Sequence, residues 1–149
     1  MKKILVCGSA RCLWDDLEQV KNWDGDVMAV NMSALHLPFD IQHWSSFHHE
    51  FFEYAVPLYN YLKPKNWVMT HSSDPGLNVK KIWRFDKHDK SGWFAAKVAC
   101  ALGYELCVLA GIPMDTDKYK WKDYIWNDLP KEKIRSLSGK TKEFFGGYE

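Results

Sequence analysis

Two short segments of this 149-residue sequence carry side chains that could do acid–base or metal-assisted chemistry. Asp115 and Asp117 form a D-x-D pair, and such a pair can hold Mg²⁺ or Mn²⁺ against a diphosphate because hard cations prefer carboxylate oxygens. His88 lies between the aspartates of the run Asp86–Lys90, where a carboxylate could orient the imidazole as a general base. His88 and Asp115 are therefore the candidate catalytic residues, and an exposed charged loop is the alternative for each segment.

The other histidines and the four cysteines have the composition of metal sites but not the spacing. His43, His48 and His49 with Glu50 read H-x-x-x-x-H-H-E, which differs from the H-E-x-x-H pattern of zinc-binding helices. A structural or surface role is therefore favoured for them, while His71 follows a predicted strand and could face a crevice. The cysteines include no C-x-x-C pair, which favours free thiols in a reducing cytoplasm over a disulfide or metal framework.

The segment after the first apolar run could bind an anion. Residues 8–11, Gly-Ser-Ala-Arg, follow the predicted strand Ile4–Cys7 and precede a helical pattern. Glycine lets the backbone approach an anion closely, free N–H groups at the start of a helix bind phosphate, and Arg11 could add a charge-assisted hydrogen bond. Neither G-x-G-x-x-G nor G-x-x-x-x-G-K-[ST] is present, so a tight strand–helix turn remains the alternative.

Three further positions carry small or amide residues where a predicted strand ends or a helix begins. Asn31 ends the strand Val27–Asn31, Ser91 can cap a long helix that continues with Gly92, and Gly111 follows the last predicted strand. Ligands of open parallel sheets bind beyond the carboxyl ends of the strands, where the strand order reverses. These positions therefore predict a nucleotide-sized crevice. The candidate nucleotide-binding residues are Gly8, Ser9, Ala10, Arg11, Asn31, Ser91, Gly92 and Gly111.

Strand and helix patterns alternate along the chain, which is typical of βαβ units. Helical patterns run from Leu13 to Val20, from His49 to Leu62 and from Ser91 to Leu102. We expect one domain over residues 1–149, of α/β, Rossmann-like class, with a mainly parallel sheet of about five or six strands flanked by helices. The polar and aromatic tail from Pro113 is expected to form loops and short helices. The predicted strands are 4–7, 27–31, 41–45, 67–70, 82–85 and 105–110.

Composition excludes several classes of protein. Twenty Lys and Arg against nineteen Asp and Glu leave a net charge of +1, which argues against nucleic-acid binding by bulk electrostatics and against disorder. No apolar run approaches the length of about 20 residues that spans a bilayer, and Ile4–Cys7 is too short for the apolar core of a signal peptide. Eight Trp among 15% aromatic residues indicate a dense core or exposed stacking surfaces, and unsatisfied aromatic surface would favour a homodimer.

Four short motifs carry a family resemblance. They are Cys-Gly-Ser-Ala (7–10), Ala-Val-Asn (29–31), Ser-Gly (91–92) ahead of Ala-Leu-Gly-Tyr (101–104), and Val-Leu-Ala-Gly-Ile (108–112). This set resembles a Rossmann-like superfamily that includes bacterial sialyltransferases using CMP-sialic acid and the 6-hydroxymethylpterin diphosphokinase-like proteins. The resemblance covers about residues 3–112 and implies that Gly8, Ser9, Asn31, Ser91, Gly92 and Gly111 line a nucleotide site. Residues 134–146 are similar to phage and prophage proteins, which implies a viral origin and the cytoplasm of a bacterial host.

The sequence departs from the family where catalysis would be placed. Pro113 stands where the family has an aspartate after Gly-Ile, and the nearest acid is Asp115. The acceptor lid and catalytic histidine of the sialyltransferases cannot be placed on this chain. We therefore expect a nucleotide or nucleotide-sugar binding protein of transferase ancestry, and leave open whether it transfers a glycosyl or pyrophosphoryl group.

Two alternatives use the same fold. One is a non-catalytic viral protein that binds a host protein or sequesters a nucleotide. The other is a nucleoside-processing enzyme, which would need a glutamate nucleophile at a strand end that we cannot place.

Overall fold

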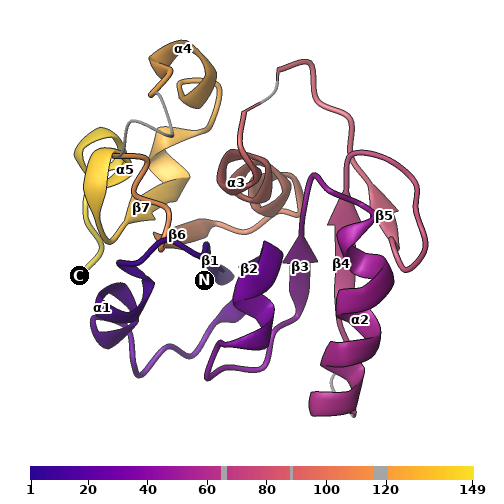
Figure 1. Ribbon diagram of the computed structural model, residues 1–149. Helices are drawn as coiled ribbons and strands as arrows, with labels where there is room; N and C mark the ends of the chain where they lie inside the picture. Colours follow the sequence, from indigo (N-terminus) through magenta and orange to yellow (C-terminus); the bar gives the residue numbers. More distant parts are fainter. Residues whose placement is uncertain (65–66, 88, 116–120) are drawn as a thin grey trace.

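The computed structural model describes residues 1–64, 67–87, 89–115 and 121–149, and its centre is a parallel sheet (Figure 1). The strand order is β5-β4-β3-β2-β1-β6-β7, and every pairing in it is parallel. The order therefore reverses between β1 and β6, which is where sheets of this kind bind ligands. The strands are β1 (Lys3–Cys7), β2 (Asp26–Val30), β3 (His43–Ser45), β4 (Met69–Ser72), β5 (Lys81–Ile82), β6 (Leu106–Ala110) and β7 (Ile134–Ser136).

The α/β, Rossmann-like class predicted from the sequence is confirmed, but the described residues form a sheet of seven strands instead of about five or six. The additional strand is β7, which lies in the tail expected to hold only loops and short helices. It has three residues, too few to show an alternating pattern, and it forms because Val108 of β6 pairs with its central residue, Arg135. The strand predicted at 67–70 lies two residues later, at Met69–Ser72, and the strand predicted at 82–85 begins one residue earlier and has only two residues, Lys81–Ile82.

Helices cover both faces of the sheet (Figure 1). Side chains alternate along β1, so that Ile4 and Val6 pack in the core under α3 while Leu5 and Cys7 pack in the core under α1 and α2. Both faces are buried, which explains why the central strands are apolar throughout. The helices are α1 (Leu13–Glu18), α2 (Phe51–Leu62), α3 (Ser91–Ala101), α4 (Asp123–Trp126) and α5 (Gly139–Phe145), with 3₁₀ turns at Asn31–Leu35 and Lys131–Lys133.

A chain of hydrogen-bonded side chains crosses the sheet on the face that α3 covers. The indole Nε1–H of Trp83 donates to His71 Nδ1 at 2.9 Å, so the proton of neutral His71 is on Nε2, which donates to His43 Nδ1 at 2.9 Å. His43 Nε2 then donates to the Tyr104 hydroxyl at 3.2 Å, and Tyr104 donates to Asp26 Oδ2. Burial lowers the pKa of His71 to about 3 and also lowers the pKa of His43. These histidines therefore have a structural role in a buried hydrogen-bonded chain, and the side chain of His71 does not face a crevice.

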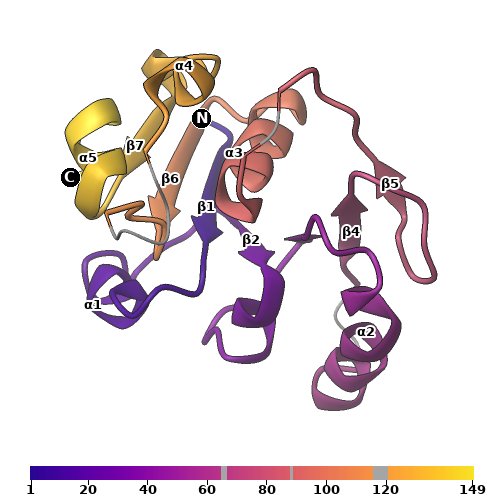
Figure 2. The same cartoon turned by 45° about the horizontal axis from the view of Figure 1, so that its top comes forward.

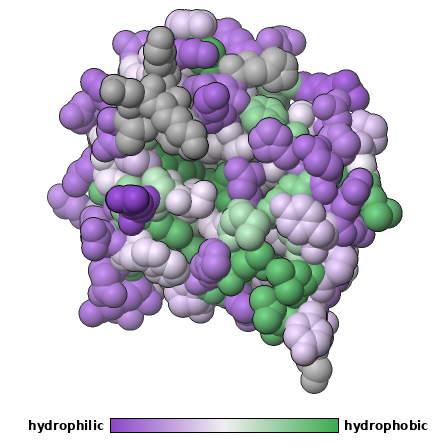
Figure 3. Space-filling model, in the orientation of Figure 1, coloured by the Kyte–Doolittle hydropathy of each residue, from purple (hydrophilic) through white to green (hydrophobic). Residues whose placement is uncertain are grey.

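Exposed apolar side chains gather on the outer face of α2. Tyr54, Leu58, Tyr61 and Leu62 recur at helical spacing and are all exposed, and Figure 3 shows hydrophobic surface where α2 lies, toward its lower right. Exposed aromatic surface is expected to favour a homodimer, and this homodimer remains a prediction. Within the described residues, no helix combines the length and apolar character needed to cross a membrane.

Candidate functional site

A cavity of about 540 Å³ lies at the carboxyl ends of β1, β2 and β6. Figure 2 shows these three strands side by side, with their arrowheads toward the same end. The cavity brings together residues separated by more than a hundred positions in the sequence. The predicted residues that line it are Gly8, Ser9, Ala10, Asn31, Ser91, Gly92, Gly111 and Asp115.

Three predicted site residues need separate treatment, because one lies away from the cavity and two lie outside the described residues. Arg11 is exposed and outside the lining set, so its contact with phosphate stays a prediction. His88 and Asp117 lie outside the described residues, so their catalytic and metal-binding roles also stay predictions. In the described ranges no group of three His, Cys, Asp or Glu side chains could hold a metal ion. The proposed Mg²⁺ or Mn²⁺ site therefore stays a prediction based on Asp115 and Asp117.

The turn after β1 and the start of α3 face each other because both pack against one side chain. A Cβ atom on Gly8 would lie 2.7 Å from Ile112 Cγ1, and a Cβ atom on Gly92 would lie 2.8 Å from Ile112 Cγ2. Real Cβ atoms do not approach other atoms this closely, so a side chain at either position would collide with Ile112, and glycine avoids the collision. Ile112 thus lies between the two glycines and fixes their separation.

Gly8→Ala is expected to destabilise the protein much more than Gly92→Ala. The new Cβ at Gly8 would lie 2.4 Å from the backbone oxygen of Gly111, which cannot move without distorting the end of β6. The expected loss is about 1–3 kcal/mol, or about 3–10 °C in Tm. At Gly92 the clash is with the end of a side chain, and a loss below about 3 °C is expected. If thermal unfolding shows equal losses of Tm for Gly8→Ala and Gly92→Ala, the backbone around Gly8 is not as rigid as argued.

Backbone donors around the cavity are unpaired. The amides of Ser9, Ser91, Gly92 and Trp93 donate to no acceptor in the described part of the chain. The last three form the first turn of α3, where unpaired N–H groups and the helix dipole favour an anion. The predicted cap, Ser91, is instead the first helical residue, and Lys90 precedes it with no side-chain capping bond. The cavity wall therefore offers a cluster of donors to an anionic ligand.

Asn31 adds an unpaired acceptor to the cavity. Its φ of 52° lies in the left-handed region, where asparagine is more common than other residues with a Cβ. Its backbone oxygen accepts the Trp44 indole N–H at 2.8 Å, but its side-chain Oδ1 is buried and has no partner among the described residues. A buried unpaired acceptor costs about 1–3 kcal/mol. Asn31 is one of the residues that line the cavity, so this unpaired acceptor belongs to the cavity wall.

Sequence reasoning missed several residues that line the cavity. Phe47 and His48 follow β3, and Asp89 and Lys90 directly precede α3. Asn31 is identified from the sequence because it stands at the end of a predicted strand. His48 stands shortly after the predicted strand 41–45 and could have been identified in the same way, but sequence reasoning considers it only as part of a histidine cluster. Asp89 Oδ2 accepts the Trp126 indole N–H at 2.7 Å, whereas Lys90 makes no ion pair within the part of the chain that is described.

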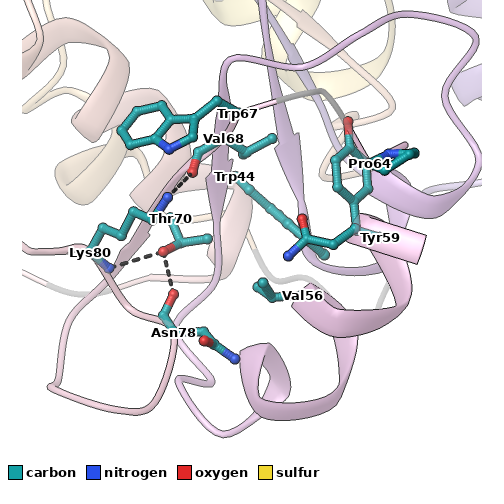
Figure 4. A pocket seen from close by; sticks show the side chains of 10 residues that line it. Trp44, Val56, Tyr59, Pro64, Trp67, Val68, Thr70, Asn78 and Lys80 are labelled. Carbon is teal, nitrogen blue, oxygen red and sulfur yellow. Dashed lines mark hydrogen bonds between the residues drawn. The ribbon is translucent and has the colours of Figure 1, made fainter. Parts of the chain in front are cut away.

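A second cavity, of about 580 Å³, lies between α2 and β4 (Figure 4). Its polar groups already bind one another. Thr70 Oγ1 donates to the Asn78 backbone oxygen and accepts the Lys80 amide N–H at 2.9 Å. The Lys80 ammonium donates to the Val68 oxygen at 3.0 Å and lies 3.9 Å from the centre of the Trp67 ring. The cavity at the strand ends, with its unpaired donors and acceptor, is therefore the better candidate for a ligand site.

One comparison with known proteins finds a similar fold. No protein-family model matches the sequence, and no curated protein matches it. Among solved structures, the chain is similar to the sialyltransferase CstII from Campylobacter jejuni in complex with a substrate analogue, cytidine-5'-monophosphate. The similarity has a TM-score of 0.68 at 17% sequence identity and covers 100% of this chain and 86% of that chain.

This similarity confirms part of the resemblance read from the sequence motifs. At such low identity it shows the fold alone. It supports a distant, sialyltransferase-like form of the Rossmann-like fold. The diphosphokinase branch and the phage origin receive no support from these comparisons. The chain therefore shares the α/β, Rossmann-like fold of a glycosyltransferase structure.

Proposed function

We propose that this protein binds a cytidine nucleotide or a CMP-linked sugar in the cavity at the strand ends, and that it descends from glycosyltransferases. The observation that carries the proposal is that unpaired hydrogen-bond donors and an unpaired acceptor occur together around one cavity. Free amides lie at Ser9 and at the start of α3, and the buried Oδ1 of Asn31 has no donor. A nucleotide supplies both an anion for the amides and O–H or N–H donors for the asparagine. The similar sialyltransferase structure holds CMP.

In this proposal the phosphate lies at the start of α3. The first-turn amides and the Ser9 amide donate to its oxygens, and the Lys90 ammonium adds a charge-assisted contact. Asn31 Oδ1 accepts a hydrogen bond from the ribose or from an amino group of the base. Phe47 lines the same cavity and packs against Phe94 at 4.5 Å between ring centres, which places an aromatic side chain where a base can contact it.

Calorimetric titration with CMP tests the proposal. We expect saturable binding of CMP, and Lys90→Ala should weaken it by about 5- to 10-fold because one charge-assisted contact to phosphate is lost. Lys21→Ala is the matched control, since Lys21 is exposed near the end of α1 and does not line the cavity. The absence of binding by CMP and by CMP-linked sugars, with the protein folded, would contradict the proposed function.

Catalysis is a separate part of the proposal. Among the described residues that line the cavity, His48, Asp89 and Asp115 could exchange a proton or hold a cation. The proline at position 113, where the resembling family has an aspartate, favours the alternative in which the protein binds or sequesters a nucleotide without turnover. Release of CMP from a CMP-linked sugar, with and without Mg²⁺, distinguishes these cases. If release occurs, His88→Ala and Asp115→Ala should abolish it.

A further inference from the structure

Asp16 is a buried carboxylate directly behind the cavity. Its side chain belongs to α1, and the residue is only 2% exposed. One carboxylate oxygen, Oδ2, accepts both the Gly111 amide N–H and the Ser138 hydroxyl, each at 2.8 Å. No Lys, Arg or His of the described chain forms an ion pair with it. A buried carboxylate without a cation is costly unless fixed donors hold it, so these two donors define its role.

Gly111, which Asp16 holds, connects two walls of the cavity. Its φ is 64°, a left-handed conformation, and its backbone oxygen accepts the Ala10 amide N–H at 3.3 Å. Beside it, the Gly8 amide donates to the Ala110 oxygen at 2.8 Å. The next residue, Ile112, is the side chain that lies between Gly8 and Gly92. A rotation of the Gly111 peptide would therefore move Ile112 and, with it, the turn at Gly8 and the start of α3 at Gly92.

The C-terminal segment supports the same turn from the other side. Thr141 Oγ1 donates to the Ile112 oxygen at 2.6 Å, and the Thr141 amide donates to the Pro113 oxygen at 3.2 Å. Ser138, which donates to Asp16, is the residue directly before α5, the helix that contains Thr141. Segments more than a hundred residues apart in the sequence thus converge on the turn formed by residues 111–113.

The geometry points to Asp16 as a positioning residue of the ligand site, acting through Gly111, with Ser138 and Thr141 as its supports. This inference rests on the proposed nucleotide binding. Asp16 does not touch the ligand. It fixes the Gly111 peptide so that the Ser9 amide and the first-turn amides of α3 remain at the separation that one phosphate requires.

Three variants on two elements test this role. Asp16→Ala removes both bonds, Asp16→Asn keeps an oxygen in the same place, and Ser138→Ala removes one bond if the Asp16 variants do not fold. Leu17→Ala is the matched control, because Leu17 is buried on the same helix but packs in the core instead of on Gly111. All variants are compared at a temperature where each is folded.

We expect Asp16→Ala to weaken CMP binding about tenfold or more, Asp16→Asn to restore most of it, and Leu17→Ala to leave it within about twofold. In ¹⁵N NMR spectra without ligand, Asp16→Ala should move the Ser9, Gly92 and Ile112 amide signals and speed hydrogen exchange at Gly111, unlike Leu17→Ala. If the wild type does not bind CMP, the proposed function fails, and these spectra still test Asp16. The positioning role is overturned if the signals at Ser9, Gly92 and Ile112 do not move, or if Asp16→Ala and Leu17→Ala weaken binding equally.

Discussion

Replacing Asn31 by glycine is expected to weaken CMP binding by about tenfold, or ~1.4 kcal/mol, without destabilising the free protein. The Oδ1 of Asn31 is buried without a partner in the described structure. This unpaired acceptor destabilises the free protein, and in the proposed complex a ligand donor satisfies it. Glycine removes that acceptor and adopts the φ of 52° without strain. The Tm of the free variant should therefore equal or exceed that of the wild type.

Two further substitutions at position 31 separate the acceptor from the backbone. Asn31→Asp keeps an acceptor oxygen at the same place but adds a negative charge near the phosphate, so its affinity should be lower than that of Asn31→Gly. Asn31→Ala keeps a Cβ in the left-handed region but lacks the short polar side chain that lets asparagine adopt it, and should cost about 1 kcal/mol of stability in addition to the lost affinity. Unchanged CMP affinity in Asn31→Gly, measured by calorimetry, would remove Asn31 from the site.

Acidification from pH 7.5 to pH 5 is expected to lower the free energy of unfolding by about 2 kcal/mol through His71 alone. Burial lowers the pKa of His71 from 6.5 to about 3 in the folded protein. The unfolded chain therefore takes up a proton below pH 6.5 while the folded chain does not. Stability is fully present above the unfolded pKa and falls as the pH drops toward 3. His43, whose pKa burial also lowers, adds a loss of the same sign.

Chemical denaturation at a series of pH values measures this dependence. His71→Gln should be less stable at pH 7.5, because the Trp83 indole and His43 lose their partner, but its stability should change less between pH 7.5 and pH 5. His36→Gln is the control, since His36 is exposed and directly follows the 3₁₀ turn Asn31–Leu35. A wild-type stability that is constant over this range would mean that the imidazoles are hydrated and that the hydrogen-bonded chain does not persist in solution.

The parts of the site that could be predicted from the sequence are those with local causes. Gly8, Asn31, Ser91, Gly92 and Gly111 each stand next to an apolar run or a helical pattern, so their place at a strand end follows from neighbouring residues alone. The parallel topology then brings such ends together without further information.

The remaining features depend on contacts between distant segments. Strand β7 has three residues and is defined by its pairing with β6. Asp16 looks like an acidic residue in the first turns of an amphipathic helix, and only the fold shows that it meets Gly111 and Ser138. His71 follows an apolar run, as a ligand-binding residue would, but its side chain points to the face covered by α3. The predicted strand ends at Thr70, whereas β4 continues to Ser72, so His71 lies inside the strand and not beyond its end.

The most direct test of nucleotide binding at the strand ends is an NMR titration of ¹⁵N-labelled protein with CMP. We expect progressive, saturable shifts of the Ser9, Gly92 and Gly111 amide signals. The Trp67 and Lys80 signals, from the cavity between α2 and β4, should remain in place. Shifts confined to Trp67 and Lys80, or no shifts at millimolar CMP, would contradict nucleotide binding at the strand ends.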